Sequence, residues 1–373
     1  MRTNTGLSAL LAATSVRAAV HELIVGTFGT TALYTLAFDD VTEELSLVKN
    51  TTTNAASSWI SFSHDKKTLY GTSFKAASTS YVSYNVVNAT TLVPNNKTLT
   101  ADNSTVSAIY VAAANKPPYN VYGVSFGSTS GPGLVMSVDQ LGGLDKVVQS
   151  YNYSNDSAVH GLAIGADGSF LYSADDTGNK IWTHAVDPAT GELTLVDSLE
   201  APETGSDPRH VAAHPSGQYL YAVMEGKSKI AQYSIDQTTG KPVYCNISFP
   251  LLPSGSNSSL YWADEVMLSK SSNLLWATNR ARTTSSKGYI SAFSLTADGA
   301  IEKQLFLTET TTSGGSANAV TPSGFSDEYV ALTDSSVGFV DVWKLAANRS
   351  TASVVSRVML EDGECCANAI WYS

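Results

Sequence analysis

The sequence predicts an all-β protein, namely a seven-bladed β-propeller with four antiparallel strands in each blade. The main observation is a phrase, a polar turn followed by an aromatic-rich strand, that starts at residues 63, 113, 165, 214, 269 and 321. Such a regular period indicates stacked or radial units. Within residues 160–200, short apolar or alternating segments are separated by turn residues, which predicts four short strands and no helix.

The two chain ends supply the remaining blade. Residues 367–372 (ANAIWY) resemble residues 317–321 (ANAVT), which open the sixth unit, and the N-terminal segment contains three strands near 22–28, 32–38 and 45–49. We therefore expect one closing blade built from both termini, because a closed ring leaves no open sheet edge. The predicted domain is a single propeller over residues 19–373.

Residues 1–18 have the features of a signal peptide. Arg2 precedes a short apolar stretch at residues 7–16, and Val16–Ala18 offers a small-residue cleavage site. The stretch is too short to span a bilayer and no later segment qualifies, so we expect no membrane span. An irregular N-terminus without a targeting function is the alternative. The leader predicts a protein that is secreted, extracellular or held in a cell wall.

Glycosylation sequons support this localisation. Nine of the twenty Asn residues stand in Asn-x-Ser/Thr, which accepts glycans on exposed turns of secreted chains. The predicted acceptors are Asn50, Asn88, Asn96, Asn103, Asn152, Asn155, Asn246, Asn257 and Asn348.

Charge and motifs narrow the choice of partners. The formal net charge is −11, and an acidic surface disfavours nucleic acid. A small anionic ligand, a carboxylate or a lactone, therefore needs a local cluster of Arg and His. No dinucleotide fingerprint, P-loop or HExxH motif is present, so we expect no cofactor. Asp176, Asp264 and Asp334 approach a metal set, but neighbouring arginines disfavour a divalent cation.

Alignment of the phrases defines two sets of equivalent positions. The first set lies five residues before a phrase, at the start of the innermost strand, and contains Ser58, His160, Arg209, Asp264 and Ser316. The second set ends each phrase and contains Phe74, Phe126, Asp176, Glu225, Arg280 and Asp334. Adjacent strands of a blade are antiparallel, so both sets should meet at one mouth of the central channel.

This mouth is the candidate active site. Guanidinium groups bind carboxylates, and imidazole and carboxylate groups transfer protons. The candidate catalytic residues are therefore His160, Glu225, Arg209 and Arg280. The candidate substrate-binding residues are Arg209, Arg280, Asp264 and Asn318. The alternative is a structural ion pair in a polar, water-filled channel.

The other histidines are expected in structural positions. His64, His184 and His214 belong to turns or strands. His210 follows Arg209, and the alternation of side chains along a strand should direct it away from the side that Arg209 occupies.

The three cysteines form neither a disulfide framework nor a metal motif. Cys245 is expected on an outer strand and to remain unbridged. The adjacent Cys365 and Cys366 precede the closing strand. A bond between these two is one alternative, while buried or free thiols are the interpretation that we favour.

The chain resembles the fungal 3-carboxy-cis,cis-muconate lactonizing enzymes, or carboxymuconate cyclases, within a wider lactonase family of seven-bladed propellers. The resemblance extends over nearly the whole chain after the leader. Its most specific stretches are KPPYNVYG (116–123), HGLAIGADGSFLYSADDTGNKIWTHAV (160–186), DPRHVAAHPSGQYLYAVME (207–225) and TSGGSANAV (312–320). In that family a His, two Arg and a Glu form the proposed site, and the matching positions are His160, Arg209, Glu225 and Arg280.

Two positions depart from the family pattern. Ser316 stands where the family has a His after the Gly-Gly pair, and Trp262 replaces an Arg before Ala-Asp. The family enzyme degrades intracellular aromatics, whereas this chain carries a leader and sequons. Because of these departures, the resemblance identifies the residues of the site but does not identify the substrate.

The resemblance implies a cofactor-free intramolecular lactonisation of an unsaturated polycarboxylate. Arg209 and Arg280 would bind carboxylates and stabilise the enolate-like charge, and either His160 or Glu225 would deliver a proton to carbon. Two other functions remain open. One is a secreted or cell-wall glycoprotein with a role in adhesion or recognition and no catalysis. The other is a lactone hydrolase.

Overall fold

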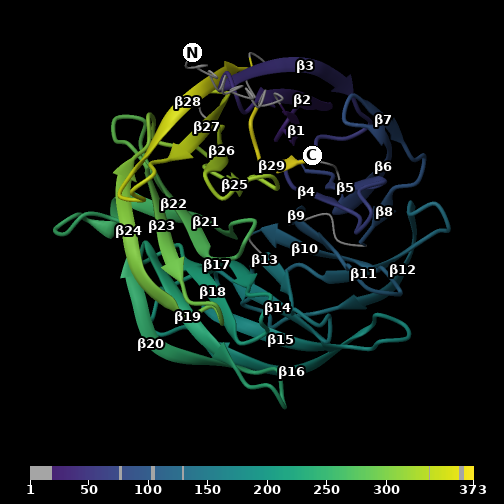
Figure 1. The fold of residues 1–373 in the computed structure, drawn as a ribbon. Coiled ribbons are helices and arrows are strands. Elements are labelled where there is room, and N and C mark those ends of the chain that lie inside the picture. The colour runs from purple at the N-terminus through teal and green to yellow at the C-terminus, as the bar shows by residue number, and fades with distance from the viewer. Residues whose placement is uncertain (1–18, 75–77, 102–105, 128–129, 336, 361–364) are drawn as a thin grey trace, which may run out of the picture.

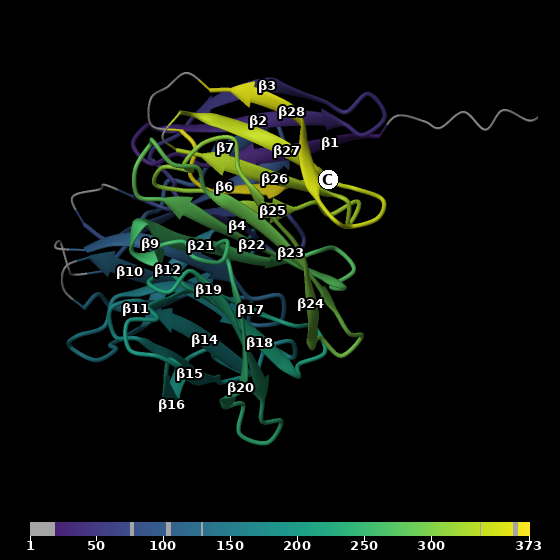
Figure 2. The ribbon, with the colours of Figure 1, turned by 90° about the vertical axis from the view of Figure 1, so that its left-hand side faces the viewer.

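The computed structural model describes residues 19–74, 78–101, 106–127, 130–335, 337–360 and 365–373. These residues form seven antiparallel sheets arranged as blades around a central axis, which Figure 1 views from one end and Figure 2 from the side. The predicted fold class is confirmed. The predicted signal peptide, residues 1–18, lies outside the described residues.

The blades follow the chain, and each runs from the innermost to the outermost strand. Blade 1 contains β4 (Ile60–Phe62), β5 (Thr68–Thr72), β6 (Ser80–Asn88) and β7 (Thr91–Pro94), with β8 (Leu99–Thr100) beside β6. Blade 2 contains β9 (Val106–Ala113), β10 (Val121–Gly127), β11 (Gly133–Val138) and β12 (Leu144–Tyr151). Blade 3 contains β13 (Val159–Ile164), β14 (Phe170–Asp175), β15 (Lys180–Val186) and β16 (Leu193–Glu200).

The next three blades repeat this order. Blade 4 contains β17 (Pro208–Ala213), β18 (Tyr219–Met224), β19 (Lys229–Ile235) and β20 (Pro242–Pro250). Blade 5 follows a short 3-10 helix (Ser258–Leu260) and contains β21 (Tyr261–Leu268), β22 (Leu274–Ala281), β23 (Tyr289–Leu295) and β24 (Ile301–Glu309). Blade 6 contains β25 (Val320–Pro322), β26 (Tyr329–Asp334), β27 (Phe339–Leu345) and β28 (Ala352–Met359).

Blade 7 is shared between the two ends of the chain, as the sequence predicts. Its innermost strand is β29 (Ala369–Trp371), and the others are β1 (Val20–Val25), β2 (Ala32–Asp39) and β3 (Glu44–Thr52). Strands β29 and β1 are antiparallel, and Trp371 faces Leu23 in their register. This pairing closes the ring and satisfies the backbone groups that an edge strand would expose.

The hydrophobic core lies in layers between neighbouring blades. In one layer Tyr122 and Val124 of β10 share a buried cluster with Leu162 and Leu171 of blade 3. In another, Tyr221 and other residues of blade 4 share a cluster with the second and third strands of blade 5. Each blade therefore buries both of its faces only when the neighbours on both sides are present.

A tyrosine of the repeated phrase joins each of four successive blades to the next. Its hydroxyl donates a hydrogen bond to the carbonyl of a turn glycine in the following blade. The pairs are Tyr70–Gly142 (2.7 Å), Tyr122–Gly191 (3.1 Å), Tyr172–Gly240 (2.9 Å) and Tyr221–Gly299. These glycines have φ values between 70° and 102°, which side chains rarely adopt. The aromatic phrase and the glycine turn thus recur together because they form one contact between blades.

The cysteines differ in part from the prediction. Cys245 is a free thiol on the outermost strand β20, as expected. Cys365 and Cys366, for which we favoured free thiols, are bonded to each other. Their Cα atoms lie 3.0 Å apart across a cis peptide bond. Because both residues are buried in the cluster between blades 6 and 7, the bond lies inside the closing interface.

Eight of the nine predicted glycan acceptors are exposed, and the ninth, Asn103, lies outside the described residues. Asn50 and Asn246, for example, stand on the outermost strands β3 and β20. Among the described residues no helix is long and apolar enough to cross a bilayer.

Candidate active site

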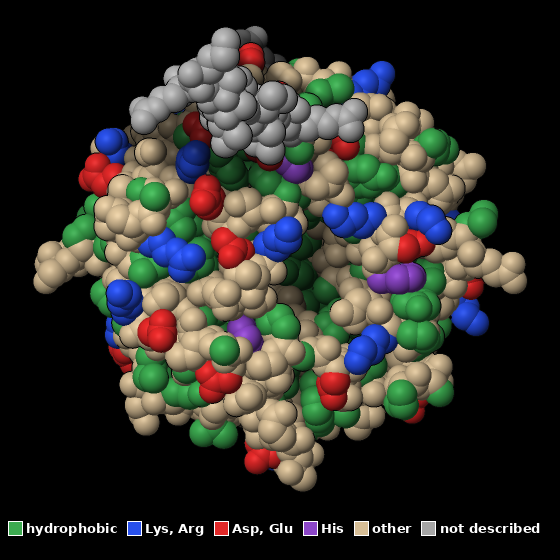
Figure 3. All heavy atoms as spheres, in the orientation of Figure 1, with side chains coloured by type: hydrophobic (Ala, Val, Ile, Leu, Met, Phe, Trp, Pro, Cys, Tyr) green, Lys and Arg blue, Asp and Glu red, His purple; other side chains and the backbone are tan. Residues whose placement is uncertain are grey.

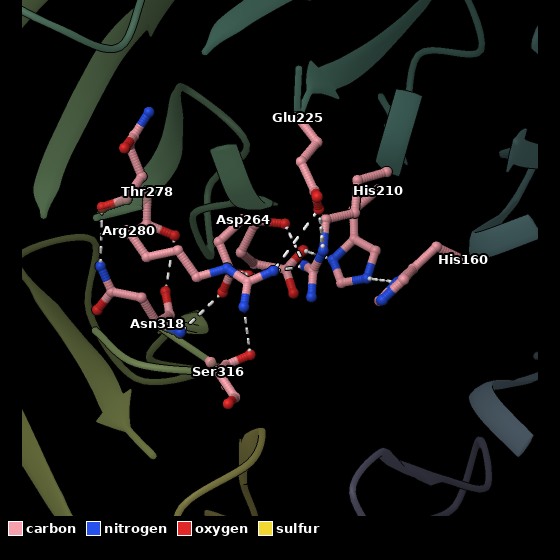
Figure 4. Close-up of polar contacts among 12 residues, drawn as sticks. His160, His210, Glu225, Asp264, Thr278, Arg280, Ser316 and Asn318 are labelled. Atoms are coloured by element: carbon pink, nitrogen blue, oxygen red, sulfur yellow. Dashed lines mark hydrogen bonds and ion pairs between the residues drawn. The ribbon is translucent and has the colours of Figure 1, made fainter. Parts of the chain in front are cut away.

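The innermost strands of blades 3, 4 and 5 and the strands next to them carry the candidate site. His160 and Arg209 are the second residues of β13 and β17, Glu225 directly follows β18, and Arg280 is near the end of β22. Figure 4 shows the side chains of His160, Glu225 and Arg280, from blades 3, 4 and 5, extending toward one another. The structure therefore brings all four candidate catalytic residues to one end of the channel.

Two guanidiniums and two carboxylates form a closed network. Arg209 Nε lies 2.9 Å from Glu225 Oε2, and Arg209 Nη1 lies 2.9 Å from Asp264 Oδ1. Arg280 Nε lies 3.1 Å from the same Asp264 oxygen, while its Nη2 is 3.6 Å from Glu225 Oε2. The weakest contact is thus the one between Arg280 and Glu225. With two charges of each sign the network is neutral, and Glu225 is its most exposed member, with 15% of its side chain accessible.

Asp264 and Asn318 hold this network from behind. Both residues are 1% exposed. Asp264 Oδ2 accepts a hydrogen bond of 2.8 Å from the backbone N–H of Asn318, and the Asn318 amide donates to the carbonyl of Asn279 at 3.2 Å. We predicted that these two residues bind substrate. In the structure Asp264 Oδ1 and Oδ2 and the Asn318 amide nitrogen contact protein groups, which also suits the two residues to orienting Arg209 and Arg280.

The backbone of residue 316 also positions a guanidinium. Arg280 Nη1 donates a hydrogen bond of 2.7 Å to the carbonyl of Ser316. This contact does not depend on the side chain, so the departure from the family pattern at Ser316 leaves Arg280 in place. At the other departure, the Trp262 ring lies 5.0 Å from the Arg280 guanidinium and 4.2 Å from that of Arg282. The tryptophan ring thus contacts two cations.

His210 does not point away, so our prediction for it was wrong. Its Nε2 atom lies 2.9 Å from Nδ1 of His160, and its Nδ1 atom lies 3.0 Å from Oε1 of Glu265. The reason is a β-bulge in β17 between Pro208 and His210, which inserts Arg209 as an extra residue. A bulge interrupts the alternation of side chains, so Arg209 and His210 both reach the channel.

Comparable bulges occur on both sides of β17. In β13 the register shifts between Val159 and Gly161, so His160 is the inserted residue. In β21 it shifts between Ala263 and Val266, so that Asp264 and Glu265 together occupy one position. In a regular strand every second side chain points into the layer between two blades. The bulges in these three neighbouring inner strands direct additional polar side chains to the channel.

Burial and neighbouring charges shift the pKa values of the site. Burial, and next the Arg209 guanidinium, hold the pKa of His160 well below its ordinary value. Burial raises the pKa of Glu225 although Arg209 and Arg280 oppose the rise. For Asp264 burial also opposes ionisation, but the two guanidiniums outweigh it and lower its pKa. At neutral pH the imidazole is uncharged, while Asp264 is the fixed anion of the network.

The axis contains two cavities. A cavity of about 20 Å³ is lined by His160, Arg209 and Asp264 together with Phe28, Ser58 and Trp59 among others. A cavity of about 250 Å³ lies farther along the inner strands and is lined by Ile60, Tyr110, Glu265, Met267 and Thr321 among others. Trp59 and Asn368 line both. The smaller cavity has room for about one water molecule, so a larger ligand binds at the mouth or displaces side chains.

The remaining members of the two sets pack around the mouth. Phe126 packs edge-on against His160 with ring centres 5.0 Å apart, and Phe74 packs edge-on against Phe28 with ring centres 5.5 Å apart. Asp334 accepts a hydrogen bond of 2.6 Å from the backbone N–H of Val337, so it closes a turn. As expected, His64, His184 and His214 occupy structural positions, because His64 stacks on Tyr119, His184 packs against Tyr151 and Tyr153, and His214 contacts Ser216.

The fold and the site together define a class, a β-propeller with a buried charged pocket where its axis meets one face. The family described as "Lactonase, 7-bladed beta-propeller" matches residues 22–317. The chain therefore belongs to this family of seven-bladed lactonases.

Particular relatives refine this assignment. The chain is 39% identical over 371 residues to the carboxy-cis,cis-muconate cyclase of Neurospora crassa, an alignment that covers 95% of this chain and 99% of that protein. It is 28% identical over 345 residues to muconate cycloisomerase 1 of Cutaneotrichosporon cutaneum, with 86% and 90% covered. The fold is similar to that of the Pseudomonas aeruginosa periplasmic gluconolactonase, with a TM-score of 0.78, 16% identity, and 95% and 99% covered.

Proposed function

We propose that this protein is an enzyme of the carboxymuconate cyclase type, which closes a lactone ring within an unsaturated polycarboxylate without a cofactor. The observation that carries the proposal is the convergence of Arg209, Arg280, Glu225 and His160 at one buried mouth. The 39% identity to a cyclase over nearly the whole chain supports it.

The chemistry requires charge stabilisation and one proton. A carboxylate oxygen of the substrate forms a C–O bond to one carbon of a double bond, and the electron pair moves to the neighbouring carbon, beside another carboxylate. Arg209 and Arg280 stabilise the enolate-like charge that develops there. His160 or Glu225 then delivers a proton to that carbon, a step that contributes roughly 10²–10⁴-fold to the rate.

Substrate binding competes with the internal ion pairs. Asp264 is 1% exposed and remains with both guanidiniums, whereas Glu225 is 15% exposed and lies 3.6 Å from Arg280. A substrate carboxylate therefore displaces Glu225 from Arg280 first. The raised pKa of Glu225 favours this exchange, because a protonated carboxyl group releases the guanidinium.

Lactone formation from 3-carboxymuconate tests the proposal. The purified protein should remove the ultraviolet absorption of the diene and yield a lactone by NMR. Arg280→Ala should abolish the reaction. Arg357→Ala is the matched control, because it also removes an arginine paired with a buried aspartate, Asp341, but away from the channel. An unchanged rate in Arg280→Ala would reject the site, and ring opening without ring closure would indicate a hydrolase.

We also propose that the protein is secreted and glycosylated, at the cell wall or in the medium. The leader and the nine sequons support this location, and the exposure of the eight described acceptors is compatible with it. Expression in a eukaryotic host should give a secreted protein whose mass falls on treatment with an N-glycosidase. Retention in the cytosol without a mass change would exclude this proposal, and a secreted protein without lactonising activity would favour an adhesion or recognition role.

A further inference from the structure

Two buried polar residues behind His160 take no part in the chemistry proposed so far. His210 is 1% and Glu265 is 2% exposed. Together with His160 they form a row in which Glu265 Oε1 lies 3.0 Å from His210 Nδ1, and His210 Nε2 lies 2.9 Å from His160 Nδ1. His210 thus has Nε2 hydrogen-bonded to His160 and Nδ1 within ion-pair distance of Glu265. The Nε2 atom of His160 is left for the mouth, where His160 lines the small cavity beside Arg209 and Asp264.

The packing around the row keeps its members in place. His210 lies edge-on to Trp59 and Tyr110, with ring centres 4.9 and 5.3 Å apart, and Phe126 contacts His160. Gly161 leaves the necessary room, because a Cβ atom there would lie 2.6 Å from His210 Cδ2. The aromatic rings cover the sides of the row, and its two ends line the two cavities.

The far end of the row reaches the second cavity. Glu265 lines the cavity of about 250 Å³ with Ile60, Tyr110 and Met267. This cavity lies toward the face where the inner strands end and where the C-terminus is found. Figure 3 views that face and shows a hollow at its centre. The row therefore connects the small cavity at the charged mouth with a larger cavity on the opposite side.

The pKa shifts indicate that all three groups are uncharged at rest. Burial, and next the Asp264 carboxylate, raise the pKa of Glu265 well above its ordinary value. Burial, and next Arg209, lower the pKa values of His160 and His210, with Arg280 acting in the same direction. A neutral imidazole can give up one proton at Nε2 only if another arrives at Nδ1. His160 therefore needs a proton source behind it, and a protonated Glu265 is such a source.

We propose that Glu265, His210 and His160 form a proton relay that delivers the proton of the cyclisation step from the Glu265 carboxyl group to the substrate carbon. At rest Glu265 carries a carboxyl proton and both imidazoles carry theirs on Nε2. His160 Nε2 gives its proton to the carbanionic carbon, His160 Nδ1 takes the Nε2 proton of His210, and His210 Nδ1 takes the proton of Glu265. One C–H bond forms, Glu265 ends as a carboxylate, and both imidazoles end with their proton on Nδ1. After the product leaves, a proton from solvent binds His160 Nε2, and the transfers from His160 Nδ1 to His210 Nε2 and from His210 Nδ1 to Glu265 restore the resting state.

The relay rests on the proposed function and decides between its two proton donors. Glu225 contacts the two guanidiniums that bind substrate carboxylates, whereas His160 is backed by His210 and Glu265, which can replace the proton that it gives up. His160 is then the catalytic residue. His210 and Glu265 are positioning residues that act through it.

The first test uses Glu265→Gln and His210→Gln with 3-carboxymuconate as substrate. Both variants should lower kcat by roughly 10- to 100-fold and leave KM unchanged, because they interrupt proton delivery and not carboxylate binding. In mixtures of H₂O and D₂O the wild-type kcat should vary non-linearly with the fraction of D₂O, because several protons move together. The curve should become linear in Glu265→Gln. His184→Gln, which removes a buried histidine that is 4% exposed and lies outside the row, is the control and should keep the wild-type kcat.

Two results would overturn the relay in this test. One is an unchanged kcat in both variants. The other is a lower kcat without any change in the dependence on deuterium, which would assign Glu265 a structural role only.

The second test needs no turnover and therefore separates the relay from the proposed function. Nitrogen-15 NMR of the ring nitrogens at neutral pH should show His160 and His210 as neutral imidazoles protonated on Nε2, with signals assigned from the His160→Gln and His210→Gln variants. An imidazolium, or a proton on Nδ1 of His160, would overturn the relay even if the enzyme is active. A protein that shows the expected tautomers but forms no lactone would contradict the proposed function alone.

Discussion

The two ends of the central channel are built from the same inner strands but differ in the groups that face the axis. At the end where these strands begin, Arg209, Arg280, Glu225 and Asp264 form a neutral network of ion pairs. Toward the other end the lining consists mainly of aromatic and aliphatic side chains, and Glu265 is the acidic residue in the second cavity. One end thus recognises charge, whereas the other offers an apolar space with one titratable group.

This difference shows how a repeated fold acquires a site. The positions along each inner strand are equivalent in all blades, but bulges in β13, β17 and β21 change which side chains reach the axis. The inner strand β9 of blade 2 has a bulge at the equivalent place, but its extra residue is the apolar Ile109. The candidate site is therefore set by the polar residues that the bulges of blades 3 to 5 carry, and not by the bulges alone.

The largest effect on stability is expected at the charged end. Asp264→Asn removes the carboxylate that two buried guanidiniums share, and it should lower the free energy of unfolding by about 3–5 kcal/mol. Asp341→Asn is the comparison, because its partner Arg357 is 33% exposed and water can replace the lost contact. Denaturation in guanidinium chloride measures the loss of unfolding free energy in both variants. Equal losses would contradict the larger contribution that we assign to Asp264.

A pH-dependent change in stability is expected from Asp176 at the same end. Burial, and next the Glu225 carboxylate, raise the pKa of Asp176 to about 8. In the unfolded chain this group ionises near pH 4. Its protonated form therefore favours the folded state at low pH, and this contribution is lost as the pH rises from about 4 to about 8.

Asp176→Asn tests this sign. The variant should be more stable than the wild type at about pH 9 and should differ little from it at about pH 4. Denaturant titrations at the two pH values give the comparison. A variant that is less stable than the wild type at the higher pH would show that Asp176 is ionised and paired in the folded protein.

At the apolar end a truncation should affect stability but not substrate affinity. Met267 lines the second cavity and is half-buried. Met267→Ala should lower the free energy of unfolding by roughly 1–2 kcal/mol through lost apolar contacts. The KM for a carboxylate substrate should stay at the wild-type value. A raised KM would place substrate in the second cavity and would remove the division of roles between the two ends.

The smallest effect is expected away from both ends, between blades. Tyr172→Phe removes the hydroxyl that donates to the Gly240 carbonyl at 2.9 Å, and it should cost about 1 kcal/mol. Activity and KM should not change. If Tyr172→Phe changed kcat as strongly as a substitution in the channel does, the contacts between blades and the candidate site would not be separate.

Much of the fold could be predicted from the sequence because six copies of one phrase report on the same structure. Tyr172 and Gly240 recur in their units for a physical reason, the contact between blades, so local irregularities in single copies do not obscure the period. The pairing of the two termini was also accessible, since residues 367–372 repeat the start of another blade. The bond between Cys365 and Cys366 was not, because adjacency in the sequence leaves the bonding state open.

The site could be predicted only in part. Equivalent positions in the repeat placed Arg209, Glu225 and Arg280 at one mouth, and the structure brings them together there. His210 and Glu265 were missed because strict alternation directs every second side chain away from the axis, and a bulge has no fixed sequence pattern. The available signal was the occurrence of two consecutive polar residues in one inner strand, as in Arg209–His210 and Asp264–Glu265.

The shared blade has a consequence for biosynthesis. While the chain is being made, the inner edge of β1 has no partner until β29 is synthesised, and β29 follows all the other described strands in the chain. A long interval follows in which blades 1 to 6 exist but the ring is open, and an unpaired strand can meet another nascent chain. A chain that terminates before β29 would keep this vulnerable edge permanently. Correct closure of the newly made polypeptide therefore depends on the synthesis of β29.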